Sequence, residues 1–481
     1  MPVGATEPYY DLGSYHRPTD TPSAAAQVWF DRGMVWAYAF NHEEAIRCFD
    51  RALELDPDFA FARWGVAYAI GPNYNKAWEA FDPVDLAASL ARARMELVLA
   101  AGGRASAVER GLIDALTARF PTEDPADLAA LAAGNTAYAD AMAALALACP
   151  DDVDVAALTA DALVNITAWA LWDSRTGEPA PGSRVLEAKR ILDDALATPA
   201  GRRHPGILHL YLHTMEMSAA PQEALPAADL LRGLVPDAGH LQHMPSHIDV
   251  LCGNYHDSIV ANLAAAQVDR HFVERSGPLN FYSLYRAHNL HFVVYSAMFE
   301  GSSAIALHAA DELASQLTPE LLAIESPPMA DWLEAFVPLR IHVLIRFGRW
   351  ADLITTPLPD DTDLYCTTAA TIHYGRGVAY AATGRLEEAR AERDAFTAAY
   401  DRIPQSRYLF NNTSRDILAV AAQMLDGEIL YRAGQFDGAF AHLRRAIELD
   451  DNLPYDEPWG WMQPTRHAYG ALLLEQGRVE E

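Results

Sequence analysis

The stretch "AQVWFDRGMVWAYAFNHEEAIRCFDRALELDPDF", residues 26–59, decides the fold, because it places small and large residues at fixed intervals. Small residues let two helices approach closely, large residues fill the gaps between them, and a proline ends the second helix. Alanine and leucine, both good helix formers, dominate the whole chain. The pattern therefore predicts a pair of packed helices. Its marker positions are Trp29, Gly33, Trp36, Ala45, Phe49, Ala52 and Pro57.

The same pattern recurs later in the chain, at "YGRGVAYAATGRLEEARAERDAF" and at "LDGEILYRAGQFDGAFAHLRRAIELD". A unit of this kind resembles the tetratricopeptide repeat (TPR), a pair of antiparallel helices in about 34 residues. The resemblance implies an all-α, TPR-like α-solenoid, a superhelix of antiparallel helical hairpins. We expect insertions to close its concave groove.

The repeats divide the predicted solenoid, which spans residues 1–481 as one body, into four regions. We expect N-terminal TPR units at 26–83, irregular helical hairpins at 84–200, histidine-rich central repeats at 201–320 and C-terminal TPR units at 321–481. The last predicted helix, "QPTRHAYGALLLEQGR", lies close to Glu481. A repeat array with an open apolar end is unfavourable, so we expect a truncated array or an end covered by a partner protein or another copy of the chain.

Composition excludes several classes of function. There are 36 basic and 65 acidic residues, and the net charge of −29 argues against nucleic acid as a partner. Four cysteines without CxxC spacing argue against a disulfide framework or a thiolate metal site. The N-terminal "MPVGATEPYYDLGSYHRPTD" lacks the features of a signal peptide, and no run of about 18 apolar residues occurs. We therefore expect a cytoplasmic protein without a membrane span.

Histidine is concentrated in the central repeats, where ten of the 17 histidines fall between His204 and His291. Three helices are predicted there, starting near Pro205, Gly239 and Ala287, the last after an insertion "HFVERSGPLNFYSLYR". The TPR resemblance implies that the second, fifth, ninth and twelfth residues of such helices face the groove. Those positions hold His209, His213 and Glu216 in the first helix, His240, His243 and His247 in the second, and His288, His291 and Tyr295 in the third.

This placement predicts a transition-metal site. Residues three or four apart share one helix face, and neighbouring helix axes lie about 8–10 Å apart, so the imidazoles can converge. An all-histidine set suits copper or zinc, whereas Glu216 would complete a two-histidine-one-carboxylate set for non-haem iron. We predict a mono- or dinuclear site built from these seven histidines, some of which hold the ligand rings in place, with Glu216 as ligand or general base and Tyr295 orienting a bound species. A lone buried histidine is more often a hydrogen-bonded core residue, but three inward clusters are not explained that way.

The proline inside "GHLQHMPSHIDV" leaves two alternatives for the second histidine helix. Either the helix already runs at Leu241 and Pro245 kinks it, or the helix starts at Pro245 and His240 and His243 lie in an irregular segment. Three other histidines, His42, His256 and His308, fall near helix turns and are expected to face solvent. His342 takes an inward position but has no partner histidine, so we do not include it in the metal site.

Other segments offer side chains for a small organic substrate. The predicted binding residues are Asn73, Asn75, Arg415, Trp459, Arg466 and His467. The alternatives are purely structural roles: a helix cap and turn for "GPNYN", and tryptophans that only cover the end of the solenoid. No GxSxG, HExxH, P-loop or GxGxxG motif is present, so the usual marks of hydrolases and nucleotide enzymes are missing.

The motifs "GPNYN", "HLYLH", "GHLQHMPSHI" and "YRAHNLHF" together resemble a bacterial group of large TPR proteins with GPNxN, HxxHMPSHI and HNxHF motifs. The resemblance spans nearly the whole chain and implies the fold, but no reaction. We therefore predict, from the histidines, a metal-dependent enzyme that uses copper or non-haem iron for redox or oxygen chemistry on a small molecule. The alternatives are a non-catalytic scaffold that binds a peptide or protein, and a protein for metal storage or delivery.

Overall fold

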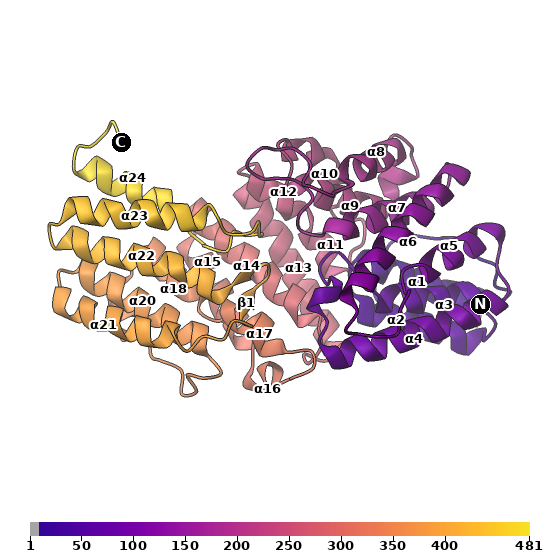
Figure 1. The fold of residues 1–481 in the computed structure, drawn as a ribbon, viewed down its shortest axis with the longest axis horizontal. Coiled ribbons are helices and arrows are strands. Elements are labelled where there is room, and N and C mark those ends of the chain that lie inside the picture. The colour runs from indigo at the N-terminus through magenta and orange to yellow at the C-terminus, as the bar shows by residue number, and fades with distance from the viewer. Residues whose placement is uncertain (1–8) are drawn as a thin grey trace. The chain divides into compact units, whose positions relative to one another are not determined.

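The computed structural model describes residues 9–481, so the beginning of the N-terminal stretch considered above lies outside the described residues. The chain divides into two compact units, Met1–Gly277 (unit 1) and Pro278–Glu481 (unit 2). Both units consist mainly of helices (Figure 1). The all-α, TPR-like solenoid architecture is thus confirmed. The boundary between the units falls inside the region 201–320 that the sequence groups as central repeats.

Unit 1 is built from helices that pack against their sequence neighbours, as α1 does on α2, α3 on α4, and α6 on α7. Short 3-10 turns at Trp78–Ala80, Asn165–Thr167, Gly201–Arg203 and Pro221–Ala224 connect some of them. The helices are α1 (Ala24–Tyr38), α2 (His42–Leu55), α3 (Ala60–Ile70), α4 (Pro83–Gly102), α5 (Ala107–Thr117), α6 (Leu128–Ala148), α7 (Val153–Val164), α8 (Val185–Leu196), α9 (Pro205–Glu216), α10 (Leu225–Leu231), α11 (Gly239–His243), α12 (Pro245–Leu251) and α13 (Tyr255–Ser276).

The first hairpin forms as its sequence pattern predicts. The Ser23 side chain accepts from the Ala26 N–H at the start of α1, and the Asn41 side chain accepts from the Glu44 N–H at the start of α2. The buried ring of Phe49 on α2 then packs between two glycines. A Cβ added at Gly33 or Gly65 would lie 2.5 or 2.7 Å from that ring. These glycines therefore let α1 and α3 close over the same phenylalanine.

Unit 2 repeats this packing, because a Cβ at Gly377 would lie 2.9 Å from the Leu425 side chain and one at Gly427 would lie 2.9 Å from that of Leu443. A two-residue antiparallel pair, β1 (Tyr408–Leu409) with β2 (Asn412–Thr413), precedes the last repeats. The helices are α14 (Ser283–Glu300), α15 (Ser303–Gln316), α16 (Pro319–Leu322), α17 (Met329–Leu333), α18 (Leu339–Arg346), α19 (Trp350–Thr355), α20 (Cys366–Ala382), α21 (Leu386–Tyr400), α22 (Ser414–Arg432), α23 (Phe436–Asp450) and α24 (Thr465–Glu475), with a 3-10 turn at Glu334–Phe336.

The third histidine helix differs in extent from its prediction. Helix α14 begins at Ser283 rather than near Ala287, and α13 continues to Ser276. Most of the predicted insertion at 271–286 is therefore helix, and only the residues between α13 and α14 connect the two. The reason is that Gly277 and Pro278 end one helix without breaking the apolar pattern that starts the next.

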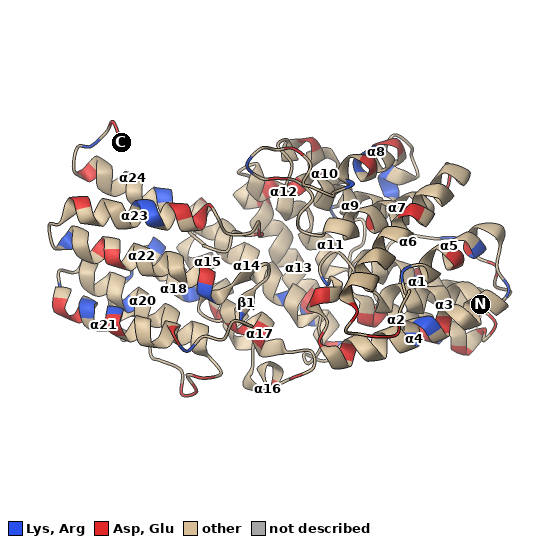
Figure 2. Ribbon diagram, in the orientation of Figure 1, with Lys and Arg blue, Asp and Glu red and all other residues tan. Residues whose placement is uncertain are grey.

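Within residues 9–481, no helix is long and apolar enough to cross a membrane. All four cysteines are free thiols. Acidic and basic side chains lie mainly on helices such as α2, α4, α8 and α21, whereas α11 carries none (Figure 2). Helix α9 carries a single charged residue, Glu216, so the histidines of α9 and α11 sit in a nearly uncharged interior.

Candidate metal centre

Five of the seven predicted histidine ligands meet inside unit 1, on α9, α11 and α12. We call these five residues the histidine cluster: His209, His213, His240, His243 and His247. Each is at most 1% exposed to solvent. Ring centroids of neighbouring members lie between 4.7 Å (His209 to His213) and 5.6 Å (His240 to His243) apart. The structure thus brings together side chains from two segments about 30 residues apart in the chain.

Helix α9 is positioned by its first turn. The His204 side chain accepts from the Ile207 N–H, and Pro205 takes the first helical position, where its missing N–H costs nothing. The next residue, Gly206, has no side chain, and a Cβ there would lie 2.5 Å from the Tyr38 ring. Because of this close approach, α9 packs directly on α1 and presents His209 to the end of that helix.

Helices α11 and α12 settle the two alternatives for Pro245. The residue between them, Met244, has right-handed helical backbone angles, so His240 and His243 belong to a helix and not to an irregular segment. The His247 N–H bonds to the Met244 carbonyl at 3.2 Å, and the Ser246 hydroxyl donates to the His243 carbonyl at 2.6 Å. At this turn the His247 N–H therefore bonds three residues back instead of four. The Ser246 hydroxyl takes the His243 carbonyl, which would accept from the His247 N–H in a regular helix.

The hydrogen-bond network assigns one tautomer to the imidazoles of α9. The Nδ1–H of His209 donates to the Tyr38 carbonyl at 2.6 Å, and the Nδ1–H of His213 donates to Glu216 Oε1 at 3.0 Å. Neither acceptor can donate a proton in return. Both rings therefore carry their lone pair on Nε2, and both Nε2 atoms are buried without a hydrogen-bond partner.

The same tautomer holds on α11 and α12. The Nδ1–H of His247 donates to the second oxygen of Glu216 at 2.8 Å, and that of His243 donates to Asn262 Oδ1 at 2.6 Å. Asn262 on α13 uses its own NH2 group on the Ser258 carbonyl at 2.8 Å, which fixes its oxygen toward His243. In all four histidines Nδ1 faces a fixed acceptor and Nε2 points away from it, which is the orientation of metal-binding histidines.

The Nε2 atoms are spaced for a shared cation. Those of His243 and His247 lie 2.7 Å apart, within hydrogen-bonding distance of each other. Two nitrogens bound at about 2.0–2.1 Å to one ion, at angles of 80–110°, would lie about 2.6–3.4 Å apart. Nitrogens of His209, His213 and His240 all lie within 4.8 Å of one another, a distance that small side-chain rotations can close around one ion. A metal ion therefore fits the donor set.

Glu216 takes a different place from a simple ligand. Each of its two carboxylate oxygens accepts from an imidazole, so one buried carboxylate holds His213 and His247 together across two helices. Carboxylates that accept the outer N–H of a histidine fix the ring and raise its basicity as a ligand. The geometry therefore favours an all-imidazole donor set with Glu216 behind it.

Burial keeps the cluster uncharged. Desolvation lowers the pKa of His209, His213, His240 and His243 well below the ordinary value, and the positive charge that a neighbouring imidazole would carry lowers each further. These rings are therefore neutral at pH 7, which is the form that binds a metal ion.

Aromatic rings in strained backbone positions close the cluster off. Phe40 has φ of 55° and packs on His209, with ring centroids 4.4 Å apart. Trp169 has φ of 59° and lies 6.2 Å from His213, beside Tyr74, whose ring is 4.6 Å from His213. A left-handed backbone costs a non-glycine residue about 1–2 kcal/mol. Strained backbone of this kind is found more often at functional sites than elsewhere.

The other two predicted histidine ligands, His288 and His291, belong to unit 2. His288 packs edge-on against Phe410, with ring centroids 4.6 Å apart, and Phe410 is itself left-handed with φ of 47°. His291 is fully buried, and its Nε2 lies 2.9 Å from the Met462 sulfur. Tyr295, predicted to orient a bound species, packs its ring on Phe299 and Trp459 instead.

Two of the predicted substrate residues, Asn73 and Asn75, lie in unit 1, and the others lie in unit 2. Asn73 is buried, and its side-chain oxygen accepts from the Asn75 N–H at 2.9 Å. Arg415 donates to the carbonyls of Tyr400 and Ile403, where it caps the end of α21.

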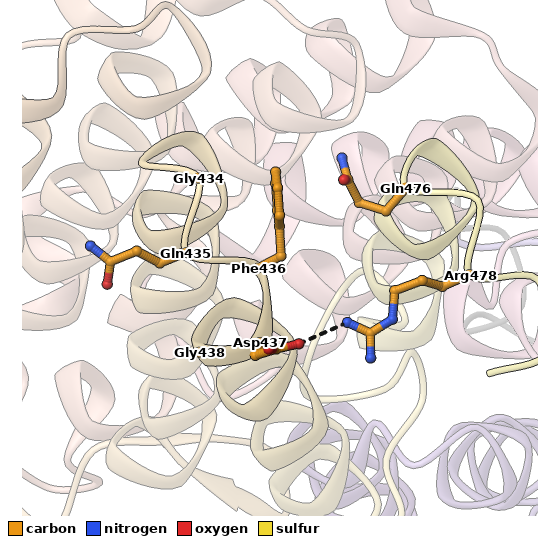
Figure 3. Close-up of a pocket in the computed structure, with 7 residues that line it drawn as sticks. All are labelled: Gly434, Gln435, Phe436, Asp437, Gly438, Gln476 and Arg478. Atoms are coloured by element: carbon orange, nitrogen blue, oxygen red, sulfur yellow. Dashed lines mark hydrogen bonds and ion pairs between the residues drawn. The ribbon is translucent and has the colours of Figure 1, made fainter.

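Near the C-terminal end of unit 2, Arg466 forms an exposed ion pair with Asp451. His467 is exposed and Trp459 is 37% exposed. A pocket of about 480 Å³ also lies in unit 2, at the α22–α23 turn and the end of α24, where Arg478 donates to Asp437 at 3.1 Å (Figure 3). None of the predicted site residues lines it; its lining residues are Gly434, Gln435, Phe436, Asp437, Gly438, Gln476 and Arg478.

Several functional neighbours escape sequence reasoning. Asn262 carries no motif, and only its position on α13, which packs on α11, brings it to His243. Trp169 lies beyond helix α7, which ends at Val164, and its ring centroid lies 6.2 Å from that of His213. The expectation that His42 faces solvent is wrong, because its ring is half-buried and bonds to the Ala69 carbonyl at 2.8 Å.

One stretch of the chain matches a known repeat. Residues 26–59 match the tetratricopeptide repeat. Protein bimA of Emericella nidulans is 32% identical over 68 residues, which are 14% of this chain and 8% of that protein. Among solved structures, yeast Tom70 has a TM-score of 0.33 and 11% identity, covering 94% of this chain and 89% of its own. The APC/C hetero-tetramer Cut9-Hcn1 has a TM-score of 0.33 and 12% identity, covering 95% and 70%.

Proposed function

We propose that unit 1 holds a transition-metal ion in the histidine cluster, with a copper or iron redox enzyme as the function that this site supports best. The observation that carries the proposal is the common orientation of His209, His213, His243 and His247. Each donates its Nδ1–H to a fixed acceptor and directs its Nε2 away from it. The buried Nε2 atoms of His209 and His213 have no hydrogen-bond partner, which is costly in a hydrophobic core unless they bind an ion.

The donor set limits which metal ions the site favours. An all-imidazole set favours copper or zinc, and occupation of both Glu216 oxygens by imidazole N–H groups weakens the case for a two-histidine-one-carboxylate iron site. Copper is therefore our first choice. The number of imidazoles is sufficient for either one or two ions. Complete burial of the cluster argues against storage or delivery, which needs an ion that exchanges readily.

Elemental analysis of protein purified without a metal-affinity tag tests the proposal. We expect a stoichiometric transition metal in the wild type and its loss in the double variant His243→Ala, His247→Ala. The matched control is His373→Ala, because His373 also pairs with a carboxylate, Glu392, at 2.6 Å but lies outside the cluster. Metal-free wild type, or a double variant with the wild-type metal content, would refute the proposal.

A second candidate is a scaffold that binds a protein partner, as the TPR match itself favours. Helix α4 supports it, because Met95, Val98 and Leu99 expose 51%, 74% and 46% of their surface within two helical turns. Cross-linking in cells followed by mass spectrometry would place partner cross-links on α4 if this reading holds. Loss of those cross-links in Val98→Glu, with metal content unchanged, would separate the two functions.

A further inference from the structure

An arginine in unit 1 is buried without a charge partner. Arg119, just beyond the end of α5, is 0% exposed. Its Nε donates to Asn135 Oδ1 at 3.0 Å, but neither Nη atom has a hydrogen-bond partner. No described carboxylate forms an ion pair with it. An uncompensated buried charge is among the most costly features that a protein interior can contain.

Another arginine of the same region shows what a structural role looks like. Arg110, on α5, directs its Nη groups to the carbonyls of Ala100, Ala101 and Gly103 at 2.7–3.2 Å. It ties the end of α4 to α5 and leaves few donors unused. Arg119 does nothing comparable with its Nη groups, although it is more deeply buried.

The acidic side chain that acts electrostatically on Arg119 is already engaged. Asp161 on α7 accepts from the Tyr68 hydroxyl at 3.0 Å and from the Asn165 amide at 2.9 Å, one bond on each oxygen. Burial raises the pKa of Asp161 and so disfavours its ionised form, in spite of the opposite effect of the Arg119 charge. Asp161 therefore does not supply the missing partner.

Two further buried donors in this part of unit 1 lack a hydrogen-bond partner. The Arg119 Cζ lies 5.1 Å from the centroid of the Tyr138 ring, and the buried Tyr138 hydroxyl has no hydrogen-bond partner. The ring of Phe120, the next residue, lies 5.9 Å from the ring of Trp78, whose buried indole N–H also lacks a partner. Burial lowers the pKa of His42, also near Arg119, to about 4, so this histidine adds no charge at pH 7. The Arg119 guanidinium is thus a buried cation whose Nη donors, like the Tyr138 hydroxyl, have no acceptor.

We propose that Arg119 anchors the carboxylate of a small organic anion, with the Tyr138 hydroxyl and the Trp78 N–H as neighbouring donors. A guanidinium binds a carboxylate through two parallel hydrogen bonds, and its single charge is balanced by a monocarboxylate rather than by a phosphate dianion. The segment that carries Trp78 also carries Tyr74, whose ring packs on His213. The site therefore adjoins the wall of the histidine cluster, but its ligand is held by this chain's own side chains and needs no metal.

Thermal unfolding and calorimetry of metal-stripped protein test the proposal, with sodium acetate, pyruvate and phenylacetate as probes and sodium chloride at equal ionic strength as reference. We expect at least one carboxylate to raise the unfolding temperature of the wild type. In Arg119→Met this response is lost and the dissociation constant rises at least about tenfold. Without ligand, Arg119→Met should unfold at the same or a higher temperature than the wild type, because an unpaired buried charge has been removed.

Arg110→Met is the matched control, and it should lower the unfolding temperature while keeping the response to carboxylate. The proposal is overturned if Arg119→Met destabilises the ligand-free protein as Arg110→Met does, since Arg119 would then be structural. It is also overturned if no carboxylate acts on the wild type beyond chloride, or if inorganic phosphate acts and the carboxylates do not. None of these outcomes depends on metal content, so they stand apart from the test of the metal centre.

Discussion

Replacing Glu216 by glutamine should weaken metal binding without unfolding the protein. The carboxylate accepts one Nδ1–H from His213 at 3.0 Å and one from His247 at 2.8 Å. Glutamine offers one accepting oxygen and one NH2 group, so one of the two imidazoles would face a donor. That ring must move its proton to Nε2, which removes its lone pair from the metal-binding position.

The size of the effect follows from this loss. Removing a hydrogen-bond partner behind a metal-binding histidine lowers metal affinity about 10–100-fold, or about 1.4–2.7 kcal/mol. Competition with a chromophoric chelator for Cu(II) and Zn(II) at pH 7.5 measures it. Imidazole ¹⁵N NMR of the metal-free variant should show one ring in the Nε2–H tautomer. The matched control is Glu392→Gln, whose carboxylate serves His373 outside the cluster.

Circular dichroism should show native helix content in both variants. Metal affinity of Glu216→Gln within twofold of the wild type would refute the reasoning, and so would wild-type tautomers in its NMR spectrum.

Three further predictions concern stability. Phe40→Gly should be less destabilising than Phe40→Ala by about 1 kcal/mol, because both variants lose the ring but only glycine relieves the positive φ. If urea unfolding shows Phe40→Ala to be the more stable variant, the backbone at this position is not strained. Gly33→Ala should cost about 1–3 kcal/mol through its collision with Phe49, whereas Gly470→Ala, with no atom within 4 Å, should be neutral or stabilising; equal effects in the same assay would contradict the packing argument. Burial raises the pKa of Glu457 to about 8, so between pH 4.5 and pH 8 the folded state keeps a proton that the unfolded state has lost. The free energy of unfolding should therefore fall by about 1.4 kcal/mol per pH unit in this range, and less steeply in Glu457→Gln. A free energy of unfolding that rises with pH would contradict this prediction.

The hairpin packing could be predicted from the sequence because it is local. Gly33 and Phe49 are read from one repeat, and the structure pairs them as the pattern requires. The spacing of His209 and His213 likewise follows from one helix. The irregular hairpins of residues 84–200 hid Arg119, since a single arginine near a helix end gives no pattern, and only its burial without a partner marks it.

Contacts between distant segments could not be predicted, because they leave no local pattern in the sequence. Glu216 was recognised as part of the site, but its role behind two imidazoles depends on how α9 and α12 pack, which one sequence does not specify. Phe40 has a left-handed backbone that is rare for phenylalanine, so no propensity predicts it. His288 and His291 belong to unit 2, and their part in the site stays a prediction.

X-ray absorption spectroscopy of the protein as isolated tests the metal centre most directly. The account predicts a stoichiometric copper or iron edge, nitrogen neighbours at about 2.0 Å, the outer-shell scattering typical of imidazole, and no sulfur neighbour. The imidazole scattering should decrease in His243→Ala, His247→Ala and persist in His373→Ala. A protein without a metal edge, or a metal surrounded by oxygen alone, would contradict the claim that the histidine cluster is a metal centre.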